Sequence, residues 1–239
     1  MNWEDESLII HTKPYKDSHT ILTLLTKSNG KRIGLARTSN KKTGNPFQVG
    51  TIGQAHWRAR LADHLGTINI DVTDVPFAKH MGDPLRLLII QSMCGLLHEL
   101  ILEHDPHPQT FADALTLLQH LHGSNPLQSY IKFEMNMLKE LGFALTLTHC
   151  AATGSREQLT YLSPKSGQAV CNSAGTPFAD KLFRMPQFFK EPNSDTPTED
   201  LIFCLNITGY FLEKCLFLPA HKKFPLARDL LIKKIGSLS

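Results

Sequence analysis

The first 80 residues alternate between hydrophobic and polar positions, whereas much of the remaining chain follows a helical period. In residues 68–73 the apolar side chains occupy every second position, as in a strand with one buried face. Turn signals separate several short runs of this kind, which predicts about five strands, enough for a small closed barrel. Asn29-Gly30 lies between two of these runs and predicts an antiparallel β-hairpin.

From Asp83 onward the hydrophobic positions follow the 3.6-residue period of an α-helix. Asp83-Pro84 is a typical helix start, with an N-cap aspartate and proline at the first helical position. The apolar residues that follow, as far as Ile101, cover most of the helix circumference, so we expect this helix to be central and buried. Two further helices are expected at 108–123 and 126–142, and the three should form a bundle.

The rest of the chain lacks one uniform pattern. Residues 144–178 are rich in Thr, Ser and Gly without a helical period, and a polar loop at 189–198 precedes two helices near 199–217 and 225–236. We therefore expect an α+β multidomain fold. Its expected parts are an N-terminal barrel at 1–80, a central helical bundle at 81–143, a loop-rich element at 144–178, and C-terminal helices at 179–239 that pack on the helical domain.

Positive charge is concentrated in the N-terminal region. Residues 13–60 contain ten Lys or Arg and one acid, Asp17, and so carry a net charge of +9, while the whole chain is only +3. The residues outside this segment therefore sum to −6. Such an asymmetry favours a polyanionic partner, because bound phosphates relieve the repulsion among the cations and release condensed counterions. Nucleic acid is the leading candidate, and a merely solvated basic face is the alternative.

Composition restricts the cellular context. The chain has 239 residues, of which 41% are hydrophobic, so it can bury a substantial core. Its N-terminus lacks the pattern of a secretory signal, and charged and polar residues interrupt the longest apolar run, 85–102. Five cysteines, an odd number, are typical of free thiols in a reducing compartment. We expect a soluble cytoplasmic protein without structural disulfides, membrane spans or membrane partners.

Catalytic motifs are incomplete. His98-Glu99 begins a zinc-protease pattern, but Leu102 occupies the position of the second histidine. Gly30-Lys31 is similar to the end of a phosphate-binding loop, yet Leu25 replaces the required glycine and Arg32 the magnesium-binding hydroxyl. No nucleophile has a recognisable partner base. We therefore expect no enzymatic activity and no cofactor.

The spacing of His104 and His107 would allow both to contact one metal ion, but histidines in loops between helices are often simply solvated. No Cys or acid stands at ligand spacing to complete a metal site there. A metalloenzyme is the third and least favoured reading of the scattered histidines and cysteines.

The alternation within residues 55–61 assigns directions to the side chains of one strand. Ala55, Trp57, Ala59 and Leu61 should face the core, and the arginines between them should face solvent. Other cations lie in the polar loop that follows the hairpin or border the hairpin itself. The candidate nucleic-acid-binding residues are Lys31, Arg32, Arg37, Lys41, Lys42, Arg58 and Arg60.

Aromatic side chains could add base stacking to this cationic surface. Trp57 is expected in the core, so Tyr15 and Phe47 are the better stacking candidates. Lysine, arginine and aromatic groups contact features common to every nucleotide, and we expect binding to tolerate any sequence.

Four segments together carry a resemblance to a known family. They are HTKPYKDSHTILTLLTKSNGKRIGLAR, HWRARLADHLGT, YIKFEMNMLKELGF and THCAATGSREQLTYLSPKSGQAVCNSAG. In this order and spacing they resemble the bacterial DNA repair and recombination-mediator family RecO, over nearly the whole chain. The resemblance implies an N-terminal OB-fold, a central helical domain and a C-terminal zinc-ribbon-like element. It also implies binding of single- and double-stranded DNA, strand annealing, and partnership with RecR and single-strand-binding protein in loading RecA.

One departure from the family concerns its metal ligands. Many members hold zinc with two C-x-x-C pairs, but here Thr153 follows Cys150 and Ala174 follows Cys171 at the paired positions. Two thiolates cannot complete a tetrahedral zinc shell, and His149 as a third ligand is a weaker possibility. We expect a degenerate, metal-free ribbon in which the two cysteines lie close together as buried groups. The residues expected to pack it are Leu159, Tyr161, Val170 and Phe178.

Two classes of function remain open. The first is a DNA-binding and annealing mediator at the nucleoid, and the alternative is an OB-fold RNA-binding protein of translation or RNA metabolism, since a backbone-binding surface need not sense a 2′-hydroxyl. The helical and ribbon-like parts favour the first. We also expect the helical domain to bind the acidic C-terminal tail of single-strand-binding protein in an apolar pocket within 85–141, with Arg86, Lys132 and Lys139 as possible cations at its rim.

Overall fold

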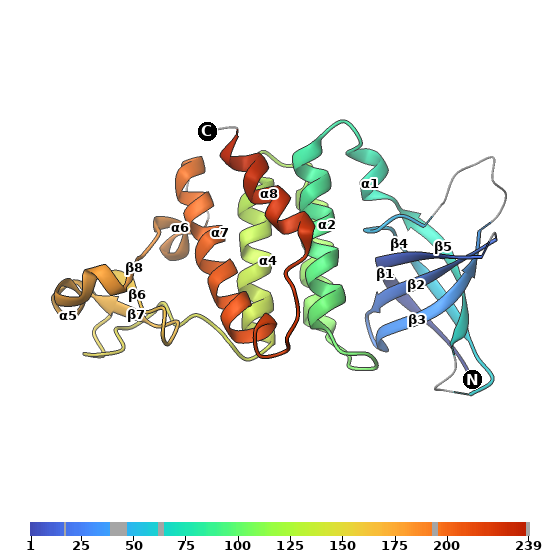
Figure 1. Cartoon of the computed structure of the whole chain (residues 1–239), viewed down its shortest axis with the longest axis horizontal. Coiled ribbons are helices and arrows are strands. Elements are labelled where there is room, and N and C mark those ends of the chain that lie inside the picture. The colour runs from blue at the N-terminus through green and yellow to red at the C-terminus, as the bar shows by residue number, and fades with distance from the viewer. Residues whose placement is uncertain (17, 39–46, 62–64, 193–195, 238–239) are drawn as a thin grey trace. The chain divides into compact units, whose positions relative to one another are not determined.

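Five N-terminal β-strands close into a barrel in the computed structural model (Figure 1). They are β1 (Asn2–Tyr15), β2 (His19–Thr26), β3 (Gly30–Arg37), β4 (Ile52–Arg58) and β5 (Gly66–Asp74). The strand order is β1-β2-β3-β5-β4, with β4 pairing back onto β1, and only the β3–β5 pair is parallel. This arrangement confirms the predicted OB-type barrel. The structure describes residues 1–16, 18–38, 47–61, 65–192 and 196–237.

The β2–β3 hairpin forms where the Asn29-Gly30 signal predicted it. Gly30 has a φ of +72°, which an L side chain rarely adopts. The buried Asp5 carboxylate accepts hydrogen bonds from the backbone N–H of Ser28 and Asn29, at 2.8 and 3.0 Å, and from the Asn29 side chain. These bonds join the turn to β1 and hold the register of the hairpin.

The barrel interior contains the inward residues of all five strands. Trp57 is 4% exposed and lies inside, as the alternation predicted, and Ala55 is fully buried. Leu61 was expected on the same face but is exposed, because β4 ends at Arg58 and the alternation ends with it. The buried cluster consists of Ile9, Leu22, Leu24, Ala36, Phe47, Ala55, Trp57 and Ile68.

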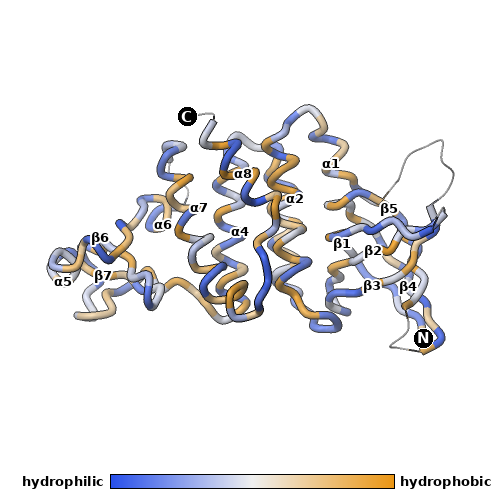
Figure 2. The backbone as a smooth tube through the Cα atoms, viewed as in Figure 1, coloured by the Kyte–Doolittle hydropathy of each residue, from blue (hydrophilic) through white to orange (hydrophobic). Residues whose placement is uncertain are grey.

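Three helices follow the barrel in the first unit, and the second of them begins at its predicted cap. They are α1 (Pro76–Lys79), α2 (Pro84–Leu100) and α3 (Pro108–His120). The Asp83 side chain accepts from the backbone N–H of Arg86 at 3.1 Å, which confirms it as the N-cap of α2. Hydrophobic residues run along α2 (Figure 2), and Ile89, Met93 and Leu97 are fully buried. The helix packs beside β1 (Figure 1), where the Cys94 thiol points at the carbonyl of Ile9.

The chain divides into two compact units, 1–122 with 224–231 and 123–223 with 232–239. The helical domain expected at 81–143 is thereby divided between the two units. Helices α2 and α3 belong to the first unit, and α4 (Pro126–Glu140) belongs to the second. In the second unit α4 packs against α7 (Thr198–Leu212), which continues into a π-helical turn, Glu213–Phe217. The last helix, α8 (Leu226–Gly236), begins in the first unit and ends in the second.

A small three-stranded sheet occupies the loop-rich region of the second unit. Its strands are β6 (Leu159–Leu162), β7 (Ala169–Cys171) and β8 (Phe183–Arg184), in the order β7-β6-β8. Between β7 and β8 lie α5 (Asn172–Gly175) and a 3₁₀ helix (Thr176–Lys181), and after β8 comes α6 (Gln187–Lys190). The zinc-ribbon likeness of this sheet stays a prediction. Of the helices in the described ranges, none is both long and apolar enough to cross a membrane.

Candidate nucleic-acid interface

Tyr15, His19 and Arg37 form a row across three neighbouring strands of the barrel. Tyr15 pairs with His19 between β1 and β2, and His19 pairs with Arg37 between β2 and β3. Residues directly opposite each other on adjacent strands project from the same face. Tyr15 is 40% exposed and Arg37 is also exposed, so an aromatic ring and a cation lie on one outer surface.

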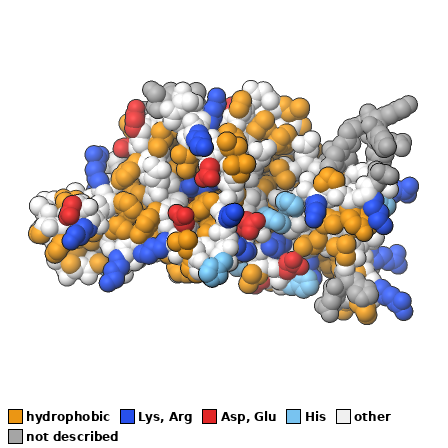
Figure 3. Space-filling view, in the orientation of Figure 1, with side chains coloured by type: hydrophobic (Ala, Val, Ile, Leu, Met, Phe, Trp, Pro, Cys, Tyr) orange, Lys and Arg blue, Asp and Glu red, His pale blue; other side chains and the backbone are white. Residues whose placement is uncertain are grey.

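A second row extends this surface around the barrel. Lys13, Ile21 and Leu35 are paired in succession, Leu35 pairs with Thr67 on β5, and Thr67 pairs with Arg58 on β4. The barrel thus brings Arg37 and Arg58 onto one continuous surface. Lys and Arg side chains project from the barrel in Figure 3. We refer to Lys13, Tyr15, His19, Ile21, Leu35, Arg37, Thr67 and Arg58 as the outer band.

Arg58 and Arg60 are both exposed, as the alternation predicted. Arg58 is the last residue of β4, and Arg60 lies just beyond the strand. His19 and Lys13 were not among the predicted site residues. Strand alternation could have suggested Lys13, but the pairing of His19 with Tyr15 and Arg37 depends on the register of three strands.

Lys31 and Arg32 lie in settings unlike those expected from the sequence. Lys31 is 8% exposed, and its Nζ donates to the carbonyl of His98 at 2.8 Å. The chain after α2 covers it, since the backbone N–H of His104 donates to the carbonyl of Lys31. The charge of Lys31 is therefore held inside the first unit, and its predicted contact with phosphate stays a prediction that these contacts do not favour.

The half-buried Arg32 lies near the beginning of β3, away from Arg37 at the end of the strand. Its Nε donates to the carbonyl of Asn29 at 2.9 Å, and its guanidinium lies 6.0 Å from the centre of the Trp3 ring. Burial lowers the pKa of Arg32, and the nearby Glu103 partly offsets this effect. These contacts give Arg32 a structural role at the hairpin. Lys41 and Lys42 lie outside the described residues.

The two stacking candidates differ in their placement. Phe47 is 9% exposed and belongs to the barrel core, so the expectation that it stacks bases is wrong. It lies outside the strands, and its burial could not be inferred from a strand pattern. Tyr15 is exposed at the end of β1, with Lys16 Nζ 5.3 Å from the centre of its ring.

The outer surface of the barrel also has an acidic part. His56 on β4 lies between two carboxylates, 3.1 Å from Glu4 and 3.0 Å from Asp71. Hydrogen bonds with Asp71 and then Glu4 raise the pKa of His56. Glu6 on the same part of β1 pairs with Lys27 at 2.7 Å. The barrel is therefore polarised, and an anion would be attracted to the outer band and repelled by the first half of β1.

The four positions at which the sequence resemblance implies zinc ligands lie in one cluster. The backbone N–H of Cys171 donates to the Cys150 sulfur at 3.2 Å, and the Thr153 hydroxyl lies 3.6 Å from the Cys171 sulfur. Ala174 packs against the same cluster but carries no ligand atom. The two thiols are close together, as expected. Two thiols, a hydroxyl and a methyl group do not fit a structural zinc ion.

Other groups do not complete this set. His149 is exposed, and its Nδ1 lies 3.2 Å from the Thr148 hydroxyl. Burial opposes ionisation of the Cys150 thiol, but hydrogen bonds from the Thr153 hydroxyl and from nearby backbone N–H groups outweigh burial and lower the pKa of Cys150 to about 6. Across the described ranges, three or more His, Cys, Asp or Glu side chains are nowhere grouped around a possible metal position.

The packing of the small sheet matches the expectation except at one residue. Leu159 and Tyr161 pack against the cluster of Cys150, Cys171 and Val170. Phe178 was expected to join them but is 56% exposed. It lies in the 3₁₀ helix, at a point where the backbone departs from helical geometry. Leu182 fills the position against the cluster instead.

Comparisons with known proteins agree with the fold. The family described as Recombination protein O N terminal matches residues 1–75, and Recombination protein O C terminal matches residues 81–223. The chain is 36% identical to DNA repair protein RecO of Rhizobium etli over 234 residues, which is 96% of this chain and 90% of that protein.

Two other relatives carry the same name. The protein from Methylocella silvestris is 36% identical over 231 residues, 95% of this chain and 93% of the relative. The protein from Wolbachia pipientis wMel is 35% identical over 239 residues, 97% of this chain and 99% of the relative. The matches span both units of the structure, and the chain belongs to the RecO family of DNA repair proteins.

Proposed function

We propose that this protein is a non-enzymatic mediator of recombinational repair that binds single- and double-stranded DNA through the outer band and anneals complementary strands. The observation that supports this most directly is the pairing of Tyr15, His19 and Arg37, which joins a ring and a cation on an exposed barrel surface. None of the residues of the outer band is acidic. Arg60, Lys41 and Lys42 are proposed to extend the surface.

Binding of this kind should be electrostatic and tolerant of sequence. Lysine and arginine contact phosphates, and an exposed tyrosine can stack on any base. The proposed site is narrower than the set of cations in the sequence, since Lys31 and Arg32 have structural partners in the first unit. If about four cations contact phosphate, log K should fall with log salt at a slope of roughly −3 for single strands.

The test compares two sets of arginines and lysines in the first unit. Replacement of Arg37, Arg58 and Arg60 with alanine should weaken binding of single-stranded DNA by a similar factor for any sequence and should flatten the salt dependence. Lys27→Ala with Lys79→Ala, which removes two cations, is the control, because these exposed lysines pair with Glu6 and Asp74. Equal loss in both variants, or no loss in the triple variant, would reject the outer band as the DNA site.

The RNA-binding alternative is addressed in the same titration. A matched RNA competitor should bind no more tightly than DNA, as a role in DNA repair requires. A clear preference for RNA would favour the alternative.

We further propose that the protein acts with RecR at the nucleoid and helps to load RecA onto strands coated by single-strand-binding protein. The tail of that protein is proposed to bind the helices. Arg86, Lys132 and Lys139 were suggested as cations at the rim of the tail pocket. Arg86 pairs with Asp83 and donates to the carbonyl of Leu121, and Lys132 Nζ lies 6.0 Å from the centre of the Phe188 ring. These contacts make Lys139 the better rim cation. Titration of a labelled tail peptide, beside one lacking its last two residues, tests this part.

A further inference from the structure

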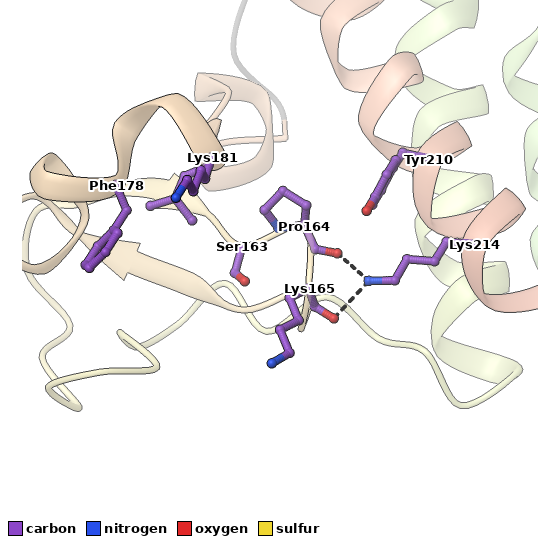
Figure 4. A pocket seen from close by; sticks show the side chains of 8 residues that line it. Ser163, Pro164, Lys165, Phe178, Lys181, Tyr210 and Lys214 are labelled. Atoms are coloured by element: carbon purple, nitrogen blue, oxygen red, sulfur yellow. Dashed lines mark hydrogen bonds between the residues drawn. The ribbon is translucent and has the colours of Figure 1, made fainter.

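The second unit contains a cavity that the proposed DNA surface does not use. Its volume is about 520 Å³, and three segments line it (Figure 4). The β6–β7 turn contributes Pro164 and Lys165, the 3₁₀ helix contributes Phe178 and Lys181, and the C-terminal part of α7 with the following π turn contributes Tyr210 and Lys214. The cavity thus combines two aromatic rings with three lysines.

The charged side chains that line the cavity are all positive. None of its lining residues is acidic. Lys214 holds the turn in place, since its Nζ donates to the carbonyls of Pro164 and Lys165 at 2.6 and 3.0 Å (Figure 4). Lys165 and Lys181 are exposed, and within the described part of the chain their side chains have no ion pair. The cavity should therefore attract an anion.

The aromatic rings lie on opposite sides of the cavity (Figure 4). Tyr210 is 37% exposed, and edge contacts with Phe183 at 5.2 Å and Phe211 at 5.3 Å hold its ring in one orientation. Phe178 is 56% exposed, which is unusual for so large an apolar side chain. It also lines an adjoining cavity of about 270 Å³, where its neighbours include the apolar Val170 and Leu182. The two cavities together place apolar side chains next to the lysines.

We propose that this cavity is a second site for single-stranded nucleic acid, in which a base contacts Phe178 or Tyr210 while adjacent phosphates contact Lys165 and Lys181. Exposed rings beside unpaired cations are what sequence-tolerant strand binding requires, because every base has a stacking face and every nucleotide a phosphate. This inference deepens the proposed function and rests on it. A chain with strand sites in both of its units can hold two complementary strands at once.

The test counts the strands that one full-length chain binds. The probe is an oligothymidylate of about eight nucleotides, which is short enough to occupy a single site. Native mass spectrometry and titration should find two equivalents for the unmodified protein. The cavity variant, Lys165→Glu with Phe178→Ala and Lys181→Glu, should bind one, and all three substitutions are at exposed positions. The matched control is Lys190→Glu with Lys223→Glu, two exposed lysines of the same unit that do not line the cavity, and it should still bind two.

A barrel variant separates this inference from the proposed function. The triple alanine variant of Arg37, Arg58 and Arg60 should also bind one equivalent, at the cavity. If it keeps both equivalents, the barrel assignment fails while the cavity assignment stands on its own variant. A cavity variant that binds as many oligonucleotides as the unmodified protein overturns the second site.

An acidic peptide is the competing ligand for the cavity. A peptide with several carboxylates and an apolar terminal residue is therefore titrated against the same proteins. Binding that is lost in the cavity variant, with oligonucleotide stoichiometry unchanged, would show a peptide site and overturn the proposal. The expected result is loss of one oligonucleotide and slower strand annealing in the cavity variant.

Discussion

Gly66 on β5 lies directly against the indole ring of Trp57 on β4. A Cβ at residue 66 would be 2.3 Å from Cε2 and Nε1 of that ring. The ring has little freedom to move, because it stacks on Trp3 with centroids 5.8 Å apart and planes inclined by 7°. Gly66 also pairs with Gly34 in the parallel contact between β3 and β5 that completes the barrel. The close approach of these strands therefore depends on the absence of a side chain at residue 66.

Gly66→Ala should destabilise the barrel. Overpacking of a dense core commonly costs about 1–3 kcal/mol, and we expect a loss of that size in the free energy of unfolding. Urea denaturation followed by tryptophan fluorescence measures it. Gly82→Ala is the control, since a Cβ there meets no atom within 4 Å and should change stability by less than about 0.5 kcal/mol. Similar losses in the two variants would contradict the steric argument.

Lys31 and Arg37 lie on the same strand and should respond in opposite ways to substitution. Lys31→Ala removes a buried hydrogen bond to His98 and should cost about 1–2 kcal/mol of stability, with the DNA affinity of the folded protein unchanged. Arg37→Ala should leave stability unchanged and reduce the slope of log K against log salt by about 0.7 for single strands. Thermal unfolding and DNA titration of both variants test this pair. Reduced affinity in Lys31→Ala alone would reverse the assignment.

Thr208 should be essential to the packing of α4 against α7. Both Thr208 and Glu134 are fully buried, and the Thr208 hydroxyl donates to the Glu134 carboxylate. Thr208→Val keeps the shape but removes the donor, which should cost about 1–3 kcal/mol because a buried acceptor loses a partner. Thr116→Val is the control, since the Thr116 hydroxyl donates to a helix carbonyl at an exposed position. Chemical denaturation should show an effect only for Thr208.

The pH dependence of stability should include a contribution from His56. Its pKa is raised in the folded protein by hydrogen bonds with Asp71 and Glu4. A histidine whose pKa is higher in the folded than in the unfolded protein contributes its full stabilisation at pH values below the unfolded-state pKa. This stabilisation is lost as the pH rises through the folded-state pKa. The melting temperature of the unmodified protein should therefore exceed that of His56→Gln most at about pH 5.5. The difference should disappear at alkaline pH, and a difference that grows with pH would contradict the assignment.

Local patterns predicted the strands, their faces and the helix starts. Trp57 is inside and Arg58 outside because alternation within one strand needs no information from the rest of the chain. Leu61 departs from the pattern because β4 ends before it, and a strand end depends on which neighbours remain to pair with. Asp83 caps its helix through a hydrogen bond that spans only three residues.

The candidate site was less predictable because it depends on contacts between distant segments. Lys31 follows the outward alternation of β3, yet a segment about seventy positions later in the chain covers it. Phe47 is buried from outside any strand. The row of Tyr15, His19 and Arg37 arises only when three strands adopt one register, and a one-residue slip would turn each side chain to the other face.

The cluster of Cys150 and Cys171 leads to a prediction about zinc binding, which two substitutions should create. The purified protein should contain no stoichiometric zinc, and its melting temperature should be the same with and without chelator, because Thr153 and Ala174 supply no thiolates. Thr153→Cys with Ala174→Cys should restore four sulfur ligands around the position where Cys150 and Cys171 already meet. That variant should bind one equivalent of zinc, detected by elemental analysis after dialysis.

Metal binding in the double variant should be coupled to stability. Because zinc would bind the folded cluster and not the unfolded chain, chelator should lower the melting temperature of the variant and leave that of the unmodified protein unchanged. The single variants serve as controls, since three thiolates leave the shell open and should hold zinc less tightly. One equivalent of zinc in the unmodified protein would show that two thiols suffice. Failure of the double variant to bind zinc would show that residues 153 and 174 do not face the two cysteines.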